Sequence, residues 1–139
     1  MKHYLLLLAC LVFPACALFQ RPFRPVHASP SEAAQVAFPM EIPEEGRQII
    51  RGPMAAAIQL AMDDFIPRDL KLPRSLTPEE VCLHQRESYD AVAAPGPEGI
   101  MFVRLTLSPE ACKMTGILLD MEVEYAVDVK GWRILAIKR

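Results

Sequence analysis

The chain has 139 residues, of which 52% are apolar, and a formal net charge of −2 at neutral pH. This length allows one domain with a modest core. Basic and acidic residues are interleaved and form no basic stripe, which argues against a nucleic-acid-binding surface. The chain contains 13 prolines, which crowd its first half, so an extended N-terminal region is expected before a folded domain.

The first residues, 1–17, have the layout of a secretory signal peptide. Lys2 and His3 precede a short apolar run at residues 5–13, and small residues follow Pro14. The run is too short to span a bilayer, although an uncleaved apolar anchor is the alternative interpretation. We therefore expect export to the envelope of a bacterial cell, in the outer membrane or the periplasm.

Two kinds of processing fit the residues around Cys16. The sequence Phe13-Pro14-Ala15-Cys16 resembles a bacterial lipobox, in which the cysteine is acylated and becomes the first mature residue. Ala15-Cys16-Ala17 also fits a small-x-small site for ordinary cleavage. The sequence therefore predicts either a lipid anchor at Cys16, which would place the protein on a membrane, or a freely secreted protein.

Prolines recur through residues 18–45 without a sustained apolar periodicity. Such a composition favours extended polyproline geometry over packing. We interpret these residues as a proline-rich tether, which contains His27. The folded domain is then expected at residues 46–139.

Helices are expected at the start of this domain. Residues 44–46 are predicted to open a helical stretch that Gly52 and Pro53 punctuate, with Pro53 as the first residue of a helix that runs to about residue 65. The following residues, up to about 65, place apolar side chains on one helical face that should cover a sheet: Met54, Ile58, Ala61, Met62 and Phe65. Thr77 is a capping residue for a second, short helix that starts at Pro78.

Two adjacent carboxylates lie near the end of the first helix. Asp63 and Asp64 could be considered a paired acid site, but neighbouring residues of a helix diverge by about 100°. We interpret them as a solvated helix end.

Strands follow the helices. The predicted strands are residues 88–94, 100–107, 121–129 and 132–138. The last two alternate with the period of two that a half-buried strand has, and residues 100–107 place apolar side chains on one face: Met101, Val103, Leu105 and Leu107. Residues 95–99 are the expected turn of a first hairpin. Lys130 and Gly131 are the expected two-residue turn of a second hairpin, because glycine tolerates positive φ, and residues 117–119 lead into it. The fold class predicted is α+β, with one or two N-terminal helices packed on an antiparallel sheet of about four strands.

Cys82 and Cys112 are the cysteines of the folded region. In an exported protein they predict a disulfide that closes a loop of about thirty residues. One alternative is a zinc site with His84, which lacks a fourth ligand, and another is a thiol nucleophile paired with His84, which needs a free thiol. The familiar phosphate-loop, nucleophile-elbow and metalloprotease motifs are absent from the sequence, so we predict no catalytic residue, metal or cofactor.

The second hairpin carries the predicted partner-binding residues. Glu122, Glu124 and Asp128 lie on one face of their strand and predict an acidic strip that could receive a basic partner. Trp132, beside the turn, is added to this surface. Tyr125 and Trp132 are also candidates for a cross-strand aromatic pair, with core packing as the alternative.

Several short motifs carry a resemblance to a known group of proteins. They are Ala61-Met62-Asp63-Asp64-Phe65, Glu124-Tyr125-Ala126-Val127-Asp128 and Gly131-Trp132-Arg133-Ile134-Leu135, together with the cysteine pair. Over about residues 54–139 the chain resembles small myxobacterial-type lipoproteins, some of which are similar to products of swarm-inhibition toxin cassettes. This resemblance implies a non-enzymatic binding or accessory lipoprotein. The alternatives are a small exported toxin enzyme and a periplasmic immunity or inhibitor protein.

Overall fold

A computed structural model of the chain describes residues 25–112 and 122–139. The predicted signal peptide, Cys16 and the residues predicted to lead into the second hairpin, 117–119, lie outside these ranges. The chain divides into two compact units, Met1–Pro43 and Glu44–Arg139.

The first unit contains the short helix α2 (Pro30–Ala33). Its start is fixed by a capping box: the Glu32 N–H donates to the Ser29 hydroxyl at 3.3 Å, and the Ser29 N–H donates to the Glu32 carboxylate at 2.9 Å. Residues 25–43 are all exposed. Part of the predicted tether is therefore helical, because the capping box provides hydrogen-bond acceptors for the backbone N–H groups at the start of the helix.

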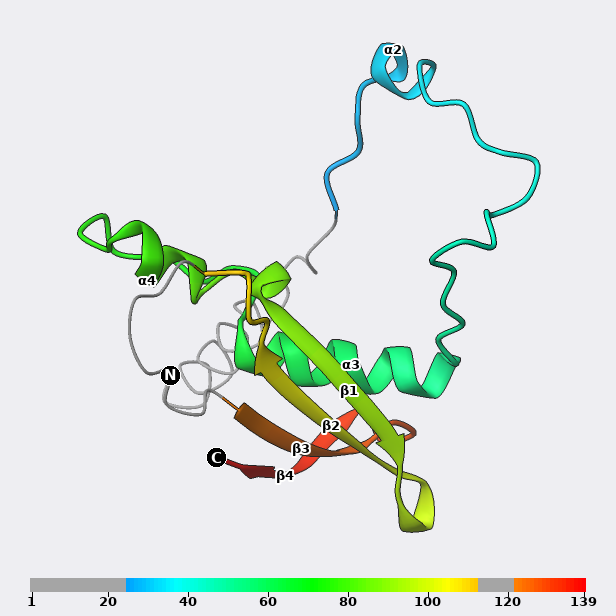
Figure 1. Ribbon diagram of the computed structural model, residues 1–139. Helices are drawn as coiled ribbons and strands as arrows, with labels where there is room; N and C mark the ends of the chain where they lie inside the picture. The colour runs from blue at the N-terminus through cyan, green and yellow to red at the C-terminus, as the bar shows by residue number, and fades with distance from the viewer. Residues whose placement is uncertain (1–24, 113–121) are drawn as a thin grey trace, which may run out of the picture. The chain divides into compact units, whose positions relative to one another are not determined.

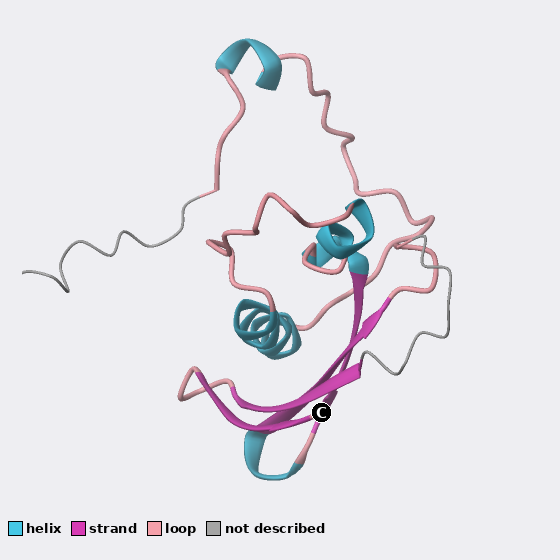
Figure 2. Ribbon diagram, turned by 90° about the vertical axis from the view of Figure 1, so that its left-hand side faces the viewer, coloured by secondary structure: helices cyan, strands magenta, loops and turns pink. Residues whose placement is uncertain are grey.

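The second unit has the predicted α+β architecture. Helix α3 (Gly52–Phe65) lies across one face of a four-stranded antiparallel sheet, as Figures 1 and 2 show. The strands neighbour one another in chain order: β1 (Tyr89–Pro95), β2 (Ile100–Leu107), β3 (Glu122–Asp128) and β4 (Arg133–Lys138). The predicted fold class and the predicted antiparallel sheet are confirmed.

Helix α3 begins later than the predicted helical stretch. Residues 44–46 belong to a turn, in which Gly46 has φ +73° and the Arg47 N–H donates to the Glu44 carbonyl at 3.2 Å. Proline occupies the first turn of α3, where its missing N–H costs no hydrogen bond. The prediction of a helix opening at residue 44 is therefore wrong, and the helix starts where the proline allows it.

The main core lies between α3 and the sheet. Ala57 and Ala61 are fully buried, and their small side chains let the helix backbone approach the strands closely. The larger apolar residues of the predicted helical face are partly buried around them. From the sheet, the core receives alternate residues of β2 and β3: Met101, Val103, Leu105, Val123, Tyr125 and Val127.

A second, smaller core surrounds the disulfide. Helix α4 (Pro78–Cys82) starts at the predicted cap, Thr77, and its last residue is bonded to Cys112. Ile66, Tyr89 and Leu107 are buried beside Cys112. Because both sulfur atoms are used in the disulfide, the zinc and thiol-nucleophile alternatives are wrong.

The two hairpins have different turns. Strands β1 and β2 are joined through the 3-10 helix η3 (Pro97–Gly99), close to the predicted turn. The connection from β3 to β4 covers residues 129–132, so the predicted two-residue turn is wrong. The positive φ of +50° belongs to Trp132 instead of Gly131. At Gly131 a Cβ atom would lie 2.5 Å from Asp128 Oδ2, so a larger residue there would displace the Asp128 carboxylate.

Strand β4 also departs from the predicted alternation. Val127 is paired with Ile134, whereas the preceding residue, Ala126, is paired with Ala136. Leu135 is thus an extra residue, which forms a β-bulge. The bulge places Ile134 and Ala136 on opposite faces of the sheet, although simple alternation puts them on the same face.

Candidate functional site

The face of the sheet opposite α3 is the candidate site, and we call it the open face. The pairing of the strands aligns its side chains in rows that cross the sheet. One row, taken from β1 to β4, has one apolar residue followed by three charged ones: Val92, Arg104, Glu124 and Lys138. The next row is apolar: Ala94, Phe102, Ala126 and Ala136.

These two rows surround a depression of about 470 Å³, which we call the open-face hollow. Its alanines are short, so the floor lies below the taller side chains of Phe102 and Arg104. Phe102 is held at one side, because its ring packs against Gly96; a Cβ atom at position 96 would lie 2.5 Å from the ring. Phe102 remains 48% exposed and Val92 65% exposed, so the hollow presents apolar surface to solvent.

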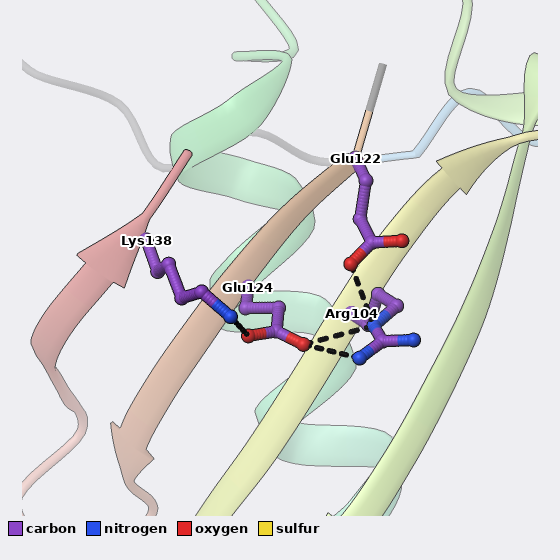
Figure 3. A network of polar contacts seen from close by, with 4 residues as sticks. All are labelled: Arg104, Glu122, Glu124 and Lys138. Carbon is purple, nitrogen blue, oxygen red and sulfur yellow. Dashed lines mark hydrogen bonds and ion pairs between the residues drawn. The ribbon is translucent and has the colours of Figure 1, made fainter. Parts of the chain in front are cut away.

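A network of ion pairs borders the hollow, as Figure 3 shows. Arg104 Nε lies 3.0 Å from Glu122 Oε1 and donates to Glu124 Oε1 at 2.9 Å. Lys138 Nζ donates to the other oxygen of Glu124 at 2.9 Å. Glu124 therefore bridges cations from the strands on both sides of β3. Glu122, Glu124 and Lys138 also surround a smaller depression of about 230 Å³.

The network changes the electrostatics of its members. Hydrogen bonds from Lys138 and then Arg104 hold the pKa of Glu124 below its usual value. The hydrogen bond to Glu124 and the nearby charge of Glu122 raise the pKa of Arg104. Two carboxylates face two cations here, so this part of the predicted acidic strip is balanced in charge.

Asp128, the third member of that strip, organises the turn that follows it. Its carboxylate accepts from the Gly131 N–H at 2.9 Å and from Arg133 Nε at 3.0 Å. The hydrogen bond from the Gly131 backbone, and to a smaller extent the one from the Arg133 side chain, lowers the pKa of Asp128. Trp132 lies in the same turn and is 53% exposed.

Tyr125 belongs to the core and does not pair with Trp132. It is 1% exposed, and its partner on β4 is Ile137. Its hydroxyl donates to Asp64 Oδ2 of α3 at 3.1 Å, which links the helix to the sheet. Burial, with a smaller effect from Asp64, raises the pKa of Tyr125 to about 12.

The adjacent carboxylates of α3 have separate partners. Asp64 accepts from Tyr125, whereas Asp63 Oδ1 lies 2.7 Å from Arg86 Nη1 and 3.2 Å from Arg68 Nε. The predicted divergence of the two side chains agrees with this arrangement. Asp64 is exposed and the side chain of Asp63 is 40% exposed, as expected for a solvated helix end, and both carboxylates also connect α3 to other parts of the domain.

Much of the site was not predicted from the sequence. The buried half of strand β2 was predicted to face the core, but the alternate residues Phe102 and Arg104 carry the open face. The signal was present, since a period-two strand assigns both faces at once. Ala126 and Ala136 give no sequence signal for a site, because only the register between strands brings them together.

Comparison of this chain with protein families, curated proteins and solved structures gives no significant match. Within residues 25–112 and 122–139, no helix is both long and apolar enough to cross a membrane. In the same ranges, no three His, Cys, Asp or Glu side chains are grouped so that they could hold a metal ion.

Proposed function

We propose that this chain is an exported lipoprotein of the bacterial cell envelope that binds a protein partner through the open face of its sheet. In this proposal Cys16 carries the lipid anchor, the proline-rich tether extends from it, and the α+β domain is a non-enzymatic binding or accessory module. The observation that carries the proposal is the open-face hollow, whose apolar floor is bordered by charged residues on a surface that no described element of the second unit covers.

The hollow favours a particular kind of partner surface. Its alanine floor suits large aromatic or branched apolar side chains, and protein interfaces commonly have such anchors at their centre. The flanking ion pairs balance one another, so the partner needs polar groups at the rim but no excess of basic residues.

The disulfide supports the proposed export of the protein. Disulfides persist in secreted and periplasmic proteins, whereas cytosolic thiols are kept reduced. The bond between Cys82 and Cys112 is compatible with an exported protein. An accessory role in an intercellular toxin system, which the resemblance implies, is part of this proposal.

Site-specific crosslinking in the native cell tests the proposal. A photoreactive phenylalanine analogue replaces Phe102 in the full chain, and in a control it replaces Gln59, which is exposed on α3. We expect one defined adduct from position 102 and none from position 59. Equal adducts from the two positions, or none, would contradict binding at the open face.

A pair of matched variants tests the hollow itself. Ala126→Arg fills the hollow, whereas Thr106→Arg introduces the same side chain on the same face outside it. We expect Ala126→Arg to remove the adduct at position 102 and Thr106→Arg to preserve it. Growth arrest caused by the exported chain, unchanged by Ala126→Arg, would favour a toxin enzyme over a binding module.

A further inference from the structure

Strand β1 forms one end of the sheet, because the strand order is β1-β2-β3-β4. It pairs with β2 over its whole length, from Tyr89 to Pro95, without a shift in register. Its other edge has no strand beside it in the described part of the chain. An unpaired edge of this kind can accept a further strand.

The backbone geometry identifies the groups on that edge. The Ser88 carbonyl accepts from the Ser108 N–H at 2.9 Å, and the Gly96 N–H donates to the Ile100 carbonyl at 2.8 Å. Because these directions alternate along a strand, the even-numbered residues of β1 face β2. The N–H and C=O groups of Tyr89, Ala91 and Ala93 therefore point toward the outer edge.

The other edge of the sheet has features that oppose strand pairing. Strand β4 contains the bulge at Leu135 and is bordered by Arg133 and Lys138. Bulges and basic side chains are common devices that protect an edge. In contrast, β1 has no shift in register, has alanines at positions 91, 93 and 94, and carries a single charge, Asp90; its proline, Pro95, is its last residue.

We propose that β1 pairs with β1 of a second copy of this chain, in an antiparallel arrangement with Val92 opposite Val92. In this register the outward N–H and C=O groups of Ala91 in one copy exchange hydrogen bonds with those of Ala93 in the other copy, on both sides of the two-fold axis. It places Asp90 opposite Ala94, so no like charges face each other. The two valines form an apolar β-branched pair on the open face.

The arrangement has a consequence for the open face. Val92 and Ala94 border the hollow and also lie on the joining strand. Pairing through β1 therefore makes the open faces of the two copies continuous, with a hollow on each side of the axis. The proposal does not depend on the identity of any ligand or partner of the open face.

Cysteine crosslinking of the full chain, exported and oxidised in the cell, tests the register. In this arrangement the Cα atoms of the two Val92 residues would lie about 4.5 Å apart, within the range that a disulfide bridges. Ala94 is on the same face, but it would lie about 13 Å along the strand from its own copy. We expect Val92→Cys to give at least about tenfold more disulfide-linked dimer than Ala94→Cys. The double variant Asp90→Cys with Ala94→Cys should restore the crosslink.

A backbone variant tests the edge without a new cysteine. Ala93→Pro removes one outward N–H and leaves the hydrogen bonds to β2 in place, as proline is tolerated on an edge strand. Light scattering should give a dimer for the parent chain and a monomer for Ala93→Pro, with the same circular dichroism spectrum. A monomeric parent chain, equal crosslinking at positions 92 and 94, or a crosslink from position 92 to a different protein would overturn the proposal.

Discussion

Removal of the disulfide should lower the stability of this domain substantially. Cys82 ends α4 and Cys112 follows β2, with a sequence separation of 30. The closed loop contains the whole β1–β2 hairpin. Replacing both cysteines with alanine keeps small apolar side chains in the second core, so the change acts mainly on the unfolded chain.

The size of the effect follows from the length of the loop. In the chain-entropy model, closing a loop of this length lowers the entropy of the unfolded state enough to stabilise the fold by about 3.6 kcal/mol. The free energy of unfolding of a whole domain is about 5–15 kcal/mol. For a domain of this size, the loss corresponds to a fall in melting temperature of roughly 15–25 °C.

Urea unfolding followed by circular dichroism measures this difference. A reducing agent provides the matched control: it should lower the stability of the parent chain to that of the double alanine variant and leave the variant unchanged. A loss below about 1 kcal/mol in both comparisons would refute the reasoning, because the loop would then contribute little entropy to the unfolded state.

Three further changes test the packing and the electrostatics. Ala61→Leu should lower the free energy of unfolding by about 1–3 kcal/mol through overpacking under the sheet, whereas Ala55→Leu on the exposed side of α3 should be nearly neutral. Burial raises the pKa of Tyr125 to about 12, so its contribution to stability is complete below pH 10 and is lost as the pH rises through 12. The variant Tyr125→Phe should therefore show a weaker pH dependence of the free energy of unfolding above pH 10. Because the pKa of Glu124 is lowered, its contribution to stability is present above pH 4.5 and is lost as the pH falls through the pKa of the folded state. The variant Lys138→Met should raise the pKa of Glu124, which an NMR titration of the carboxyl groups measures.

The sequence contained enough information to predict the architecture. Alternation placed Val103 and Leu105 in the core, and the helical face of α3 was identified from Ile58 and Ala61. These predictions succeed because burial of one face imposes a period on the residues that form it. The disulfide was predictable because two cysteines in the folded domain of an exported protein are most simply bonded to each other.

The second hairpin shows where such reasoning fails. The bulge at Leu135 and the positive φ of Trp132 arise from the way β4 pairs with β3, and neither interrupts the apolar pattern. The pairing of Glu124 with Arg104 has the same origin, because a residue's cross-strand neighbours depend on the register. The acidic strip was predicted from one strand alone, so the cations that balance it were missed.

The proposed lipid anchor and disulfide can be tested together by measuring the intact mass of the protein recovered from the cell envelope. We expect a chain that starts at Cys16 with attached lipid, and in which Cys82 and Cys112 are oxidised. An unmodified chain that starts at Leu18 would correct the anchor but keep the export. A chain that begins at Met1, found in the cytosol with both thiols reduced, would contradict the account.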